Sequence, residues 1–178
     1  MIIYFLRHAN AGPKHFSNAA KDEKRPIDKV GEEQSHDVGH ALAAMGVAVN
    51  AIISSPLTRA MQTAAIVSQE IGHEEKLVID DSLRPEASFD KFKALLNRHK
   101  DKVAVMVVGH DPSMTEFVSR VLSGGGPLAA IEMKKGGVAK VEIDIHRQAV
   151  LKWSMPPKVV QKIQRGSAKR SRPKTASK

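Results

Sequence analysis

The chain has 178 residues, a size typical of one domain with a full core, so two separate catalytic domains are not expected. It contains no cysteine, which excludes disulfides, thiolate nucleophiles and cysteine-ligated metal centres. Its net charge of +9 suggests a nucleic-acid binder, but residues 158–178 hold eight of the 28 basic side chains and no acidic one, so residues 1–157 are almost neutral.

Four short apolar segments rich in β-branched residues are predicted strands: residues 2–6, 49–53, 76–79 and 103–108. Helix-like segments separate them, a pattern typical of a mostly parallel sheet with helices on both faces. Residues 138–144 and 149–155 alternate apolar and polar side chains around a short polar turn, which predicts a C-terminal β-hairpin. The predicted fold class is therefore α/β, a three-layer sandwich with a mostly parallel central sheet flanked by helices.

Local signals place the helices between these strands. Asp28 is positioned to cap a helix over about residues 29–46. Ser54-Ser55-Pro56 predicts a second helix that starts near Pro56, with proline at its first position. Asp111-Pro112 repeats this signature before a helix that ends at the glycines 124–126.

The segment HDVGH at 36–40 places two histidines four residues apart on a predicted helix, a spacing that can bind zinc. The apolar stripe of that helix centres near Val38, so both histidines are predicted to face solvent. Asp37 also replaces the longer glutamate of metalloprotease helices. We therefore expect neither a metal site nor a cofactor.

The predicted globular unit is residues 1–157, and residues 158–178 form a basic tail. Its last stretch combines charge with serine, proline and glycine and cannot bury apolar surface, which predicts a flexible tail. The alternative is an anchor for an acidic partner or nucleic acid. The opening MIIYFLRH lacks signal-peptide features and no apolar run approaches the ~20 residues of a membrane span, so we expect a cytoplasmic protein without a membrane partner. A monomer is the favoured oligomeric state.

Reactive side chains are predicted to gather at one edge of the sheet. Arg7 and His8 directly follow the first strand, and His110 directly follows the fourth. Arg59 lies in the first turn of the helix after the second strand. Because the carboxyl ends of parallel strands and the amino ends of helices meet at this edge, the set is expected to bind an anion there. Arginine supplies a planar fork for phosphate oxygens and neutral imidazole supplies a nitrogen nucleophile, which indicates phosphoryl chemistry.

Five segments carry a family resemblance in chain order: LRHANA at 6–11, RPIDKVG at 25–31, SSPLTRAMQTA at 54–64, VGHDP at 108–112 and KWSMPP at 152–157. With them the chain resembles the histidine phosphatase superfamily, which has the phosphoglycerate mutase-like fold. Within it, the pattern is similar to the SixA-type phosphohistidine phosphatases. The hallmark Arg-His-Gly triplet of the superfamily is Arg7-His8-Ala9 here.

The resemblance implies a metal-independent phosphatase in which His8 attacks phosphorus and forms a phosphohistidine intermediate that water then hydrolyses. It further implies that Arg7, Arg59 and His110 surround the phosphate. Arg25, in the RPIDKVG segment, is a further phosphate or substrate ligand by the same resemblance. The arginines would supply the positive charge that a metal ion supplies elsewhere.

The general acid and the substrate are less defined by the resemblance. Larger members carry a carboxylate between the second and fourth strands that protonates the leaving oxygen, and Glu86 is the candidate here, against the alternative of an ordinary loop carboxylate. About 20 residues between the third and fourth predicted strands leave little room for a lid. We therefore expect a phosphorylated signalling protein of the histidine phosphotransfer type as the substrate. The alternatives are a small-molecule phosphomonoesterase and a non-catalytic polyanion-binding protein that uses the basic tail.

Overall fold

The computed structural model describes residues 1–14, 18–124, 131–146 and 148–170. Within these ranges, one sheet has the strand order β3-β2-β4-β1-β5-β6. The parallel strands are β1 (Ile2–Arg7), β2 (Ala51–Ser54), β3 (Val78–Ile79) and β4 (Ala104–Gly109). The antiparallel strands are β5 (Val138–Ile143) and β6 (Ala149–Met155). The predicted strands and the C-terminal hairpin are therefore confirmed.

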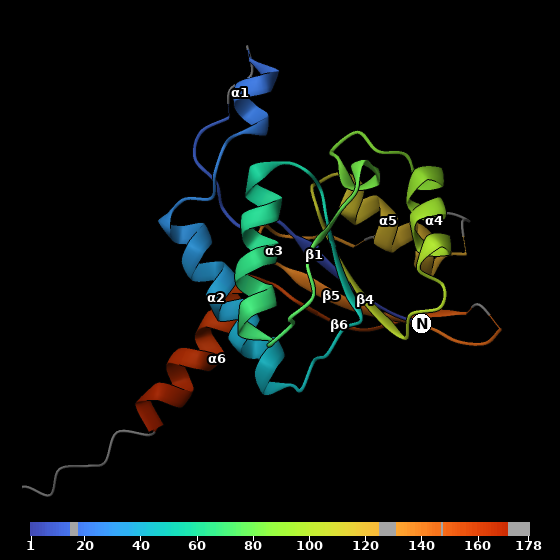
Figure 1. Ribbon diagram of the computed structural model, residues 1–178. Coiled ribbons are helices and arrows are strands. Elements are labelled where there is room, and N and C mark those ends of the chain that lie inside the picture. The colour runs from blue at the N-terminus through green and yellow to red at the C-terminus, as the bar shows by residue number, and fades with distance from the viewer. Residues whose placement is uncertain (15–17, 125–130, 147, 171–178) are drawn as a thin grey trace, which may run out of the picture.

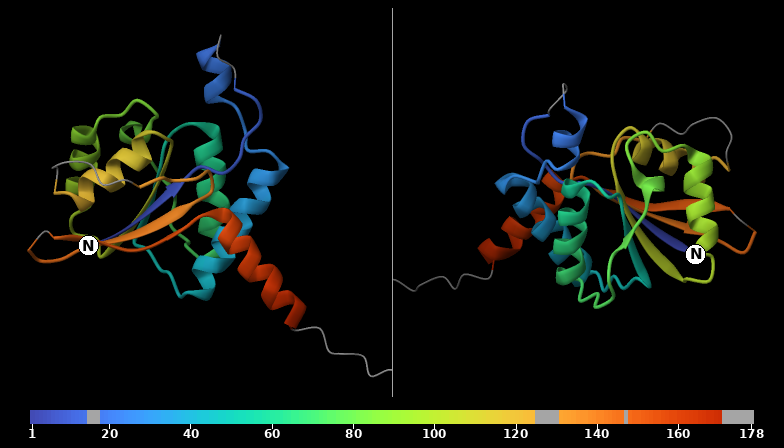
Figure 2. Two further views of the ribbon diagram at one scale, coloured as in Figure 1. Left: turned by 180° about the vertical axis from the view of Figure 1, so that it is seen from behind. Right: turned by 45° about the horizontal axis from the view of Figure 1, so that its top comes forward.

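Helices cover both faces of this sheet, as Figure 1 and the two further views of Figure 2 show. One face carries α2 (Lys29–Ala44), α3 (Thr58–Glu70) and α6 (Pro157–Arg170). The other face carries α4 (Phe89–Arg98) and α5 (Ser113–Leu122). The short helices are α1 (Ala19–Glu23) and η1 (Asp81–Leu83). This arrangement is the predicted three-layer α/β sandwich.

The alternation of side chains along β1 divides the core into two clusters. Ile3 and Phe5 point to the α4–α5 face, where Phe92 and Phe117 stack with ring centroids 4.4 Å apart. Tyr4 and the other even-numbered residues point to the α2–α3 face. Because both faces are apolar, β1 is buried on both sides, which explains its nearly continuous apolar sequence.

The start of α2 is built as predicted. The Oδ1 atom of Asp28 accepts a hydrogen bond from the backbone nitrogen of Gly31 at 2.9 Å. A Cβ atom on Gly31 would lie only 2.0 Å from the carbonyl oxygen of Asn10. Glycine at this position therefore lets α2 begin directly against the loop that follows β1.

The starts of α3 and α5 differ from the prediction. Helix α3 begins at Thr58 rather than at Pro56, and the residue before it makes no side-chain cap. Helix α5 begins at Ser113, again without a side-chain cap. Ser55 and Asp111 were expected to cap these helices. Instead, Ser55 is hydrogen-bonded to His110 and Asp111 forms an ion pair with Arg7. Gly124 ends α5 with a φ of +62°, as predicted, and glycines 125 and 126 lie outside the described residues.

The first part of the basic tail is helical, since α6 runs from Pro157 to Arg170. Helix α6 packs on the α2–α3 face, and Val160 is 1% exposed beside Val38 and Leu42. Val160 near its start supplies the buried contact that the charged stretch lacks. Residues 171–178 lie outside the described residues. In the described ranges, no helix combines the length and apolar character needed to span a bilayer.

Candidate active site

The register of β1 against β4 brings the two predicted site histidines together. Arg7 is paired with Gly109 in the parallel ladder, so the next residues, His8 and His110, leave the sheet side by side. The backbone nitrogen of His8 donates to the carbonyl oxygen of Gly109 at 2.9 Å. The centroids of the two imidazole rings are 5.0 Å apart.

The backbone fixes one ring nitrogen of His8. Its Nδ1 lies 2.7 Å from the carbonyl oxygen of Ala9, and because a carbonyl can only accept, Nδ1 carries the proton. The backbone nitrogen of Ala9 donates in turn to Oγ1 of Thr63 on α3 at 3.0 Å. The pKa of His8 is lowered from 6.5 to about 3, mainly by burial; the Ala9 hydrogen bond opposes this shift, and the nearby Arg59 and Arg7 add to it. Nε2 therefore keeps its lone pair at neutral pH.

The second imidazole is also neutral. The Nε2 atom of His110 is hydrogen-bonded to the hydroxyl of Ser55 at 2.8 Å. Burial is the main cause that lowers its pKa to about 2, with smaller effects from His8 and Arg59. Its Nδ1 is buried and has no partner among the residues that the structure describes.

Arg7 is held from two sides at the end of β1. Its NH1 atom donates to the carbonyl oxygen of Met133 at 2.6 Å and lies 3.3 Å from Oδ2 of Asp111. Asp111 therefore orients the arginine rather than capping α5. These contacts fix the guanidinium plane next to the nucleophile.

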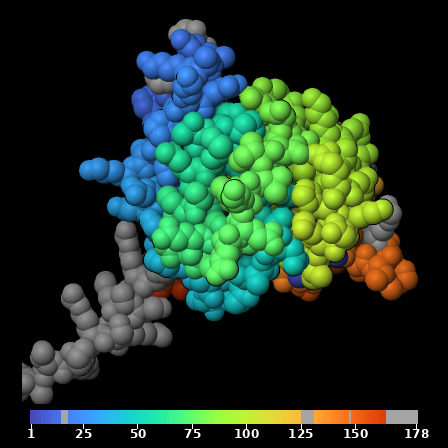
Figure 3. All heavy atoms as spheres, in the orientation of Figure 1, coloured from blue at the N-terminus to red at the C-terminus, as the bar shows by residue number. Residues whose placement is uncertain are grey.

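The other two arginines are joined by a carboxylate on α1. The Nε atom of Arg25 donates to Oδ1 of Asp22 at 2.9 Å. The NH1 atom of Arg59 lies 3.3 Å from Oδ2 of Asp22 and donates to its backbone oxygen at 2.9 Å. Figures 1 and 3 show that the segment between β1 and α2, which carries α1, stands out from the body above α3; we call this segment the arm. The arm thus brings Asp22 and Arg25 to the edge of the sheet.

One cavity of about 310 Å³ collects these groups. The sequence-predicted residues that line it are Arg7, His8, Arg25, Arg59 and His110. Lys14 and Lys135 add two further cations, whereas Asp22 and Asp111 are the carboxylates among its lining residues. The balance of charge is positive, which suits an anionic ligand.

The side chains that line this cavity hold most of the unsatisfied buried nitrogens. Four buried side-chain nitrogens lack a hydrogen-bond partner within the described ranges, and three of them belong to Arg7 (Nε), Arg59 (Nε) and His110 (Nδ1). The fourth belongs to His73. Buried polar atoms are almost always paired in folded proteins, so such a cluster indicates a site built for a ligand with hydrogen-bond acceptors. Phosphoryl oxygens have this property.

The structure does not bring Glu86 together with these residues. Glu86 is exposed and lines a neighbouring hollow with Ser88 and Glu116, whereas only the adjacent Pro85 reaches the His8 cavity. This placement does not support the general acid predicted from the sequence.

Several residues of the site were missed in the sequence. Asp111 stood in the VGHDP segment but was interpreted as a helix cap, and Thr63 stood in the SSPLTRAMQTA segment without a role. Asp22 lies in a charged stretch with no apolar pattern. Lys135 follows the glycine-rich segment after α5, and only the pairing of β5 with β1 brings it near His8.

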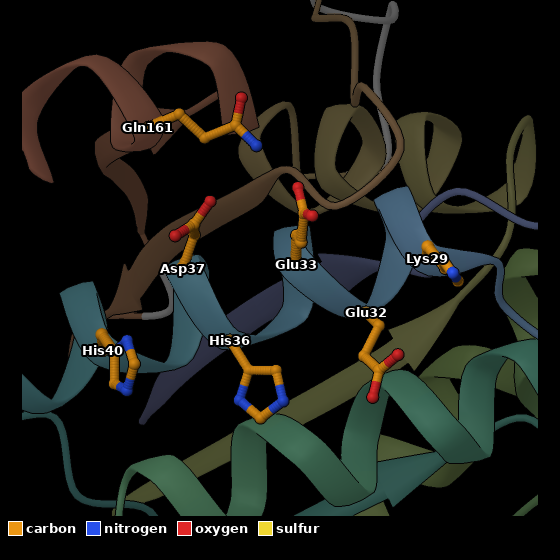
Figure 4. Close-up of a pocket in the computed structure, with 7 residues that line it drawn as sticks. All are labelled: Lys29, Glu32, Glu33, His36, Asp37, His40 and Gln161. Atoms are coloured by element: carbon orange, nitrogen blue, oxygen red, sulfur yellow. The ribbon is translucent and has the colours of Figure 1, made fainter. Parts of the chain in front are cut away.

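The two histidines of the HDVGH segment are exposed to solvent over 43% and 59% of their side chains, as predicted, but they also contact α3. His36 and His40 point from α2 toward α3 (Figure 4), where each bonds one oxygen of Glu70, at 2.7 and 2.8 Å. Gly39 lies between them, and a Cβ atom there would be 2.5 Å from that of Glu70, so glycine permits the approach. The two rings are therefore only partly solvent-facing. No group of three metal-binding side chains converges in the part of the chain that the structure describes.

Comparisons with known proteins agree with this geometry. A protein of Picosynechococcus sp. (strain ATCC 27264 / PCC 7002 / PR-6), itself uncharacterised, is 30% identical over 169 residues, which are 88% of this chain and 100% of that protein. Phosphohistidine phosphatase SixA of Escherichia coli K12 is 23% identical over 159 residues, or 88% of this chain and 94% of SixA. The structure of the protein histidine phosphatase SixA complexed with tungstate has a TM-score of 0.77 at 22% identity and covers 89% of this chain and 98% of that one.

A protein-family model assigns the chain to a family. The model of the histidine phosphatase superfamily (branch 1) matches residues 3–95, which run from β1 into α4 and include His8, Arg25 and Arg59. This match covers more than half of the chain, and the resemblance predicted from the sequence is confirmed. The protein therefore belongs to the histidine phosphatase superfamily, and SixA-type phosphatases are among the proteins that it resembles in sequence and in fold.

Proposed function

We propose that this protein is a metal-independent phosphatase that removes the phosphoryl group from phosphohistidine in another protein, through a covalent intermediate on His8. The observation that supports it most is the state of His8, a buried neutral imidazole whose Nδ1 is bonded to Ala9, so that Nε2 keeps its lone pair. Arg7 and Arg59 line the same cavity with unsatisfied Nε atoms. A nucleophile next to fixed positive charge suits attack on an anion.

In the first step, Nε2 of His8 forms a bond to phosphorus while the bond from phosphorus to the leaving nitrogen or oxygen breaks. Negative charge spreads over the phosphoryl oxygens, and the guanidinium groups of Arg7, Arg25 and Arg59 donate to them. The His8 ring becomes cationic, and its Nδ1 keeps its proton and donates it in a hydrogen bond to the carbonyl oxygen of Ala9. The neutral His110 ring contributes hydrogen bonding without adding charge.

In the second step, a water oxygen attacks phosphorus, its proton passes to solvent, and the bond between phosphorus and His8 breaks. Inorganic phosphate and neutral His8 are the products. The arginines need no movement between the steps because Asp22 and Asp111 already hold them. Charge supplied in this way replaces the metal ion that other phosphatases use.

The surroundings of the leaving group favour a phosphoramidate substrate. Asp22 and Asp111 both form ion pairs with arginines, so the carboxylate groups that line the cavity are already engaged in holding those side chains. Glu86 lies in another hollow. A leaving imidazole can take its proton from solvent, whereas an alkoxide leaving group depends on an acid in the site. Phosphohistidine is therefore a better match than an alkyl phosphate.

The test is turnover of a ³²P-labelled histidine phosphotransfer protein by the wild type, with EDTA present and absent. We expect phosphate release in both cases and an acid-labile label on the enzyme after a rapid quench. His8→Ala should lose turnover by at least 10³-fold and lose the label, because no other nitrogen takes its place. His99→Ala, outside the cavity at the end of α4, is the matched control.

Three outcomes would contradict the proposal. Substantial turnover by His8→Ala would reject the covalent route. A requirement for added zinc or magnesium would reject metal independence. Faster turnover of a panel of sugar and nucleotide phosphates than of the phosphoprotein would make the protein a small-molecule phosphatase.

A further inference from the structure

Lys135 is attached to the nucleophile segment by backbone hydrogen bonds. The turn that contains it closes with Gly136, at a φ of +69°, whose nitrogen donates to the carbonyl oxygens of Arg7 and His8, each at 3.1 Å. The nitrogen of Arg7 donates back to the carbonyl oxygen of Gly137 at 3.1 Å. Such a set of bonds couples the position of Lys135 to that of His8 more firmly than a surface loop would.

The ammonium group of Lys135 is held toward the cavity and has a neutral partner. Its Nζ donates to Oδ1 of Asn10 at 3.1 Å, two residues after His8. Burial lowers the pKa of Lys135, and repulsion from Arg7 and Arg25 lowers it further. Each of the three arginines of the cavity, by contrast, has a carboxylate partner.

The cavity holds more positive charge than one phosphoryl group can neutralise. Five cationic side chains line it against two carboxylates, which leaves +3 when both imidazoles are neutral. A phosphoryl group brings about −1.5 to −2 at pH 7. An excess of about one positive charge remains, and Lys135 is a lining cation whose hydrogen bond goes to a neutral amide, that of Asn10.

We propose that Lys135 binds a second anionic group of the substrate, a carboxylate or phosphate a few bonds away from the phosphoryl group that is transferred. This inference rests on the proposed function and defines its substrate class. In a phosphorylated protein, the second group would be an aspartate or glutamate beside the phosphohistidine. In a small molecule, it would be a carboxylate on the same carbon chain.

A matched pair of inhibitors tests the binding site without turnover. Phosphonoacetate and methylphosphonate share the phosphonate, and only the first carries a second anion. We expect the wild type to bind phosphonoacetate more tightly, and Lys135→Met to reduce that preference roughly tenfold, as for loss of a charge-assisted hydrogen bond. Lys134→Met, in the same turn but ion-paired with Glu132 and outside the cavity, is the control and should keep it.

Two results would overturn the proposal. An unchanged preference in Lys135→Met would mean that this lysine does not meet the second anion. An equal loss of affinity for both inhibitors would mean that it binds the phosphonate itself. The assay measures how each inhibitor displaces a labelled phosphate analogue from the protein. It needs no turnover, so it tests Lys135 even if the proposed function fails.

Substrate pairs then identify the source of the second anion. Two phosphohistidine peptides that differ only by aspartate or asparagine next to the phosphohistidine should differ in kcat/KM, with the aspartate peptide faster. In Lys135→Met, this ratio should fall toward one, while Lys134→Met keeps it. Lys135→Met could reduce the preference for phosphonoacetate while the two peptides are turned over equally well by the wild type. That result would overturn a protein-borne second anion and assign the site to a small carboxylated substrate.

Discussion

His8 is a buried imidazole among guanidinium groups, and both features disfavour its protonation. A histidine with the usual pKa of about 6.5 is partly protonated near neutral pH, but this ring stays neutral because its pKa is lowered to about 3, mainly by burial. The same burial leaves three nitrogens of the cavity unsatisfied in the described residues. The site is thus arranged for an anion at the expense of the stability of the free protein.

The lowered pKa values predict that acid destabilises the fold through the two histidines. Below pH 6.5 the unfolded chain binds a proton at each ring, whereas the folded chain does so only near pH 3 for His8 and pH 2 for His110. The unfolded state therefore binds more protons, and the free energy of unfolding falls as the pH falls through this window. Each histidine contributes a slope of about 1.4 kcal/mol per pH unit.

The measurement is urea unfolding between pH 6 and pH 4 for the wild type and for His8→Asn. The variant lacks one of the two rings, so its loss of stability should be smaller by about 1.4 kcal/mol per pH unit. His146→Asn, in the exposed turn between β5 and β6, is the control that should follow the wild type. Parallel slopes for all three proteins would show that His8 is not a buried neutral base.

At the scale of elements, the site joins a rigid sheet edge to an arm. His8 and His110 leave paired positions of β1 and β4, and Arg59 is held by its position in the first turn of α3. Arg25 instead comes from the arm, where Asp22 connects it to Arg59. Asp22 is therefore a positioning residue, since it acts on the phosphate through the two arginines.

Asp22→Asn tests whether Asp22 acts by positioning Arg25 and Arg59 or only through its negative charge in the cavity. The amide cannot hold both guanidinium groups, so kcat should fall roughly tenfold, the size expected for a lost charge-assisted hydrogen bond. The cavity also gains net positive charge, so the inhibition constant of inorganic phosphate should stay equal or decrease. Steady-state kinetics with phosphate as a product inhibitor measures both quantities.

The split between the two constants distinguishes this role from a general loss of structure. A misfolded or loosened site would weaken phosphate binding and slow turnover together. Asp101→Asn, exposed in the loop before β4, is the charge-matched control and should change neither constant. An unchanged kcat in Asp22→Asn would contradict the positioning role.

At the scale of the whole molecule, the sheet and its order of helices follow from patterns in the sequence. The apolar runs of β1 and β4 are long and buried on both faces, so their type is unambiguous. Helix ends were less predictable because Ser55 and Asp111 serve the site instead of the helices. Local capping rules do not include such long-range contacts.

The site was predictable only where a residue follows a strand or carries a family motif. His8 and His110 meet those conditions, and the structure brings them together with Arg7 and Arg59. Lys135 depends on the antiparallel pairing of β5 with β1, which no local pattern reports. Glu86 is the residue after Pro85, which lines the cavity, but Glu86 itself lines the neighbouring hollow, so closeness in sequence does not place a side chain in the site.

Whether α6 packs against the body can be tested by mutation. A packed helix and the flexible tail expected from the composition predict different effects on stability. Two neighbouring valines of α6 provide the test, because Val160 is 1% exposed and Val159 is 45% exposed. Val160→Ala removes two buried methyl groups and should lower the free energy of unfolding by about 2 kcal/mol. Val159→Ala should change it by less than about 0.5 kcal/mol.

Trp153, which contacts Tyr4 in the sheet below α6, is the only tryptophan of the chain and reports urea unfolding by its fluorescence. A large difference between the two variants would place the first turns of α6 in the folded domain and move its boundary beyond residue 157. Equal, small effects would mean that this segment does not pack in solution. In that case the basic residues from 158 onward would be free for a polyanion, and salt-sensitive binding lost on truncation after Pro157 would follow.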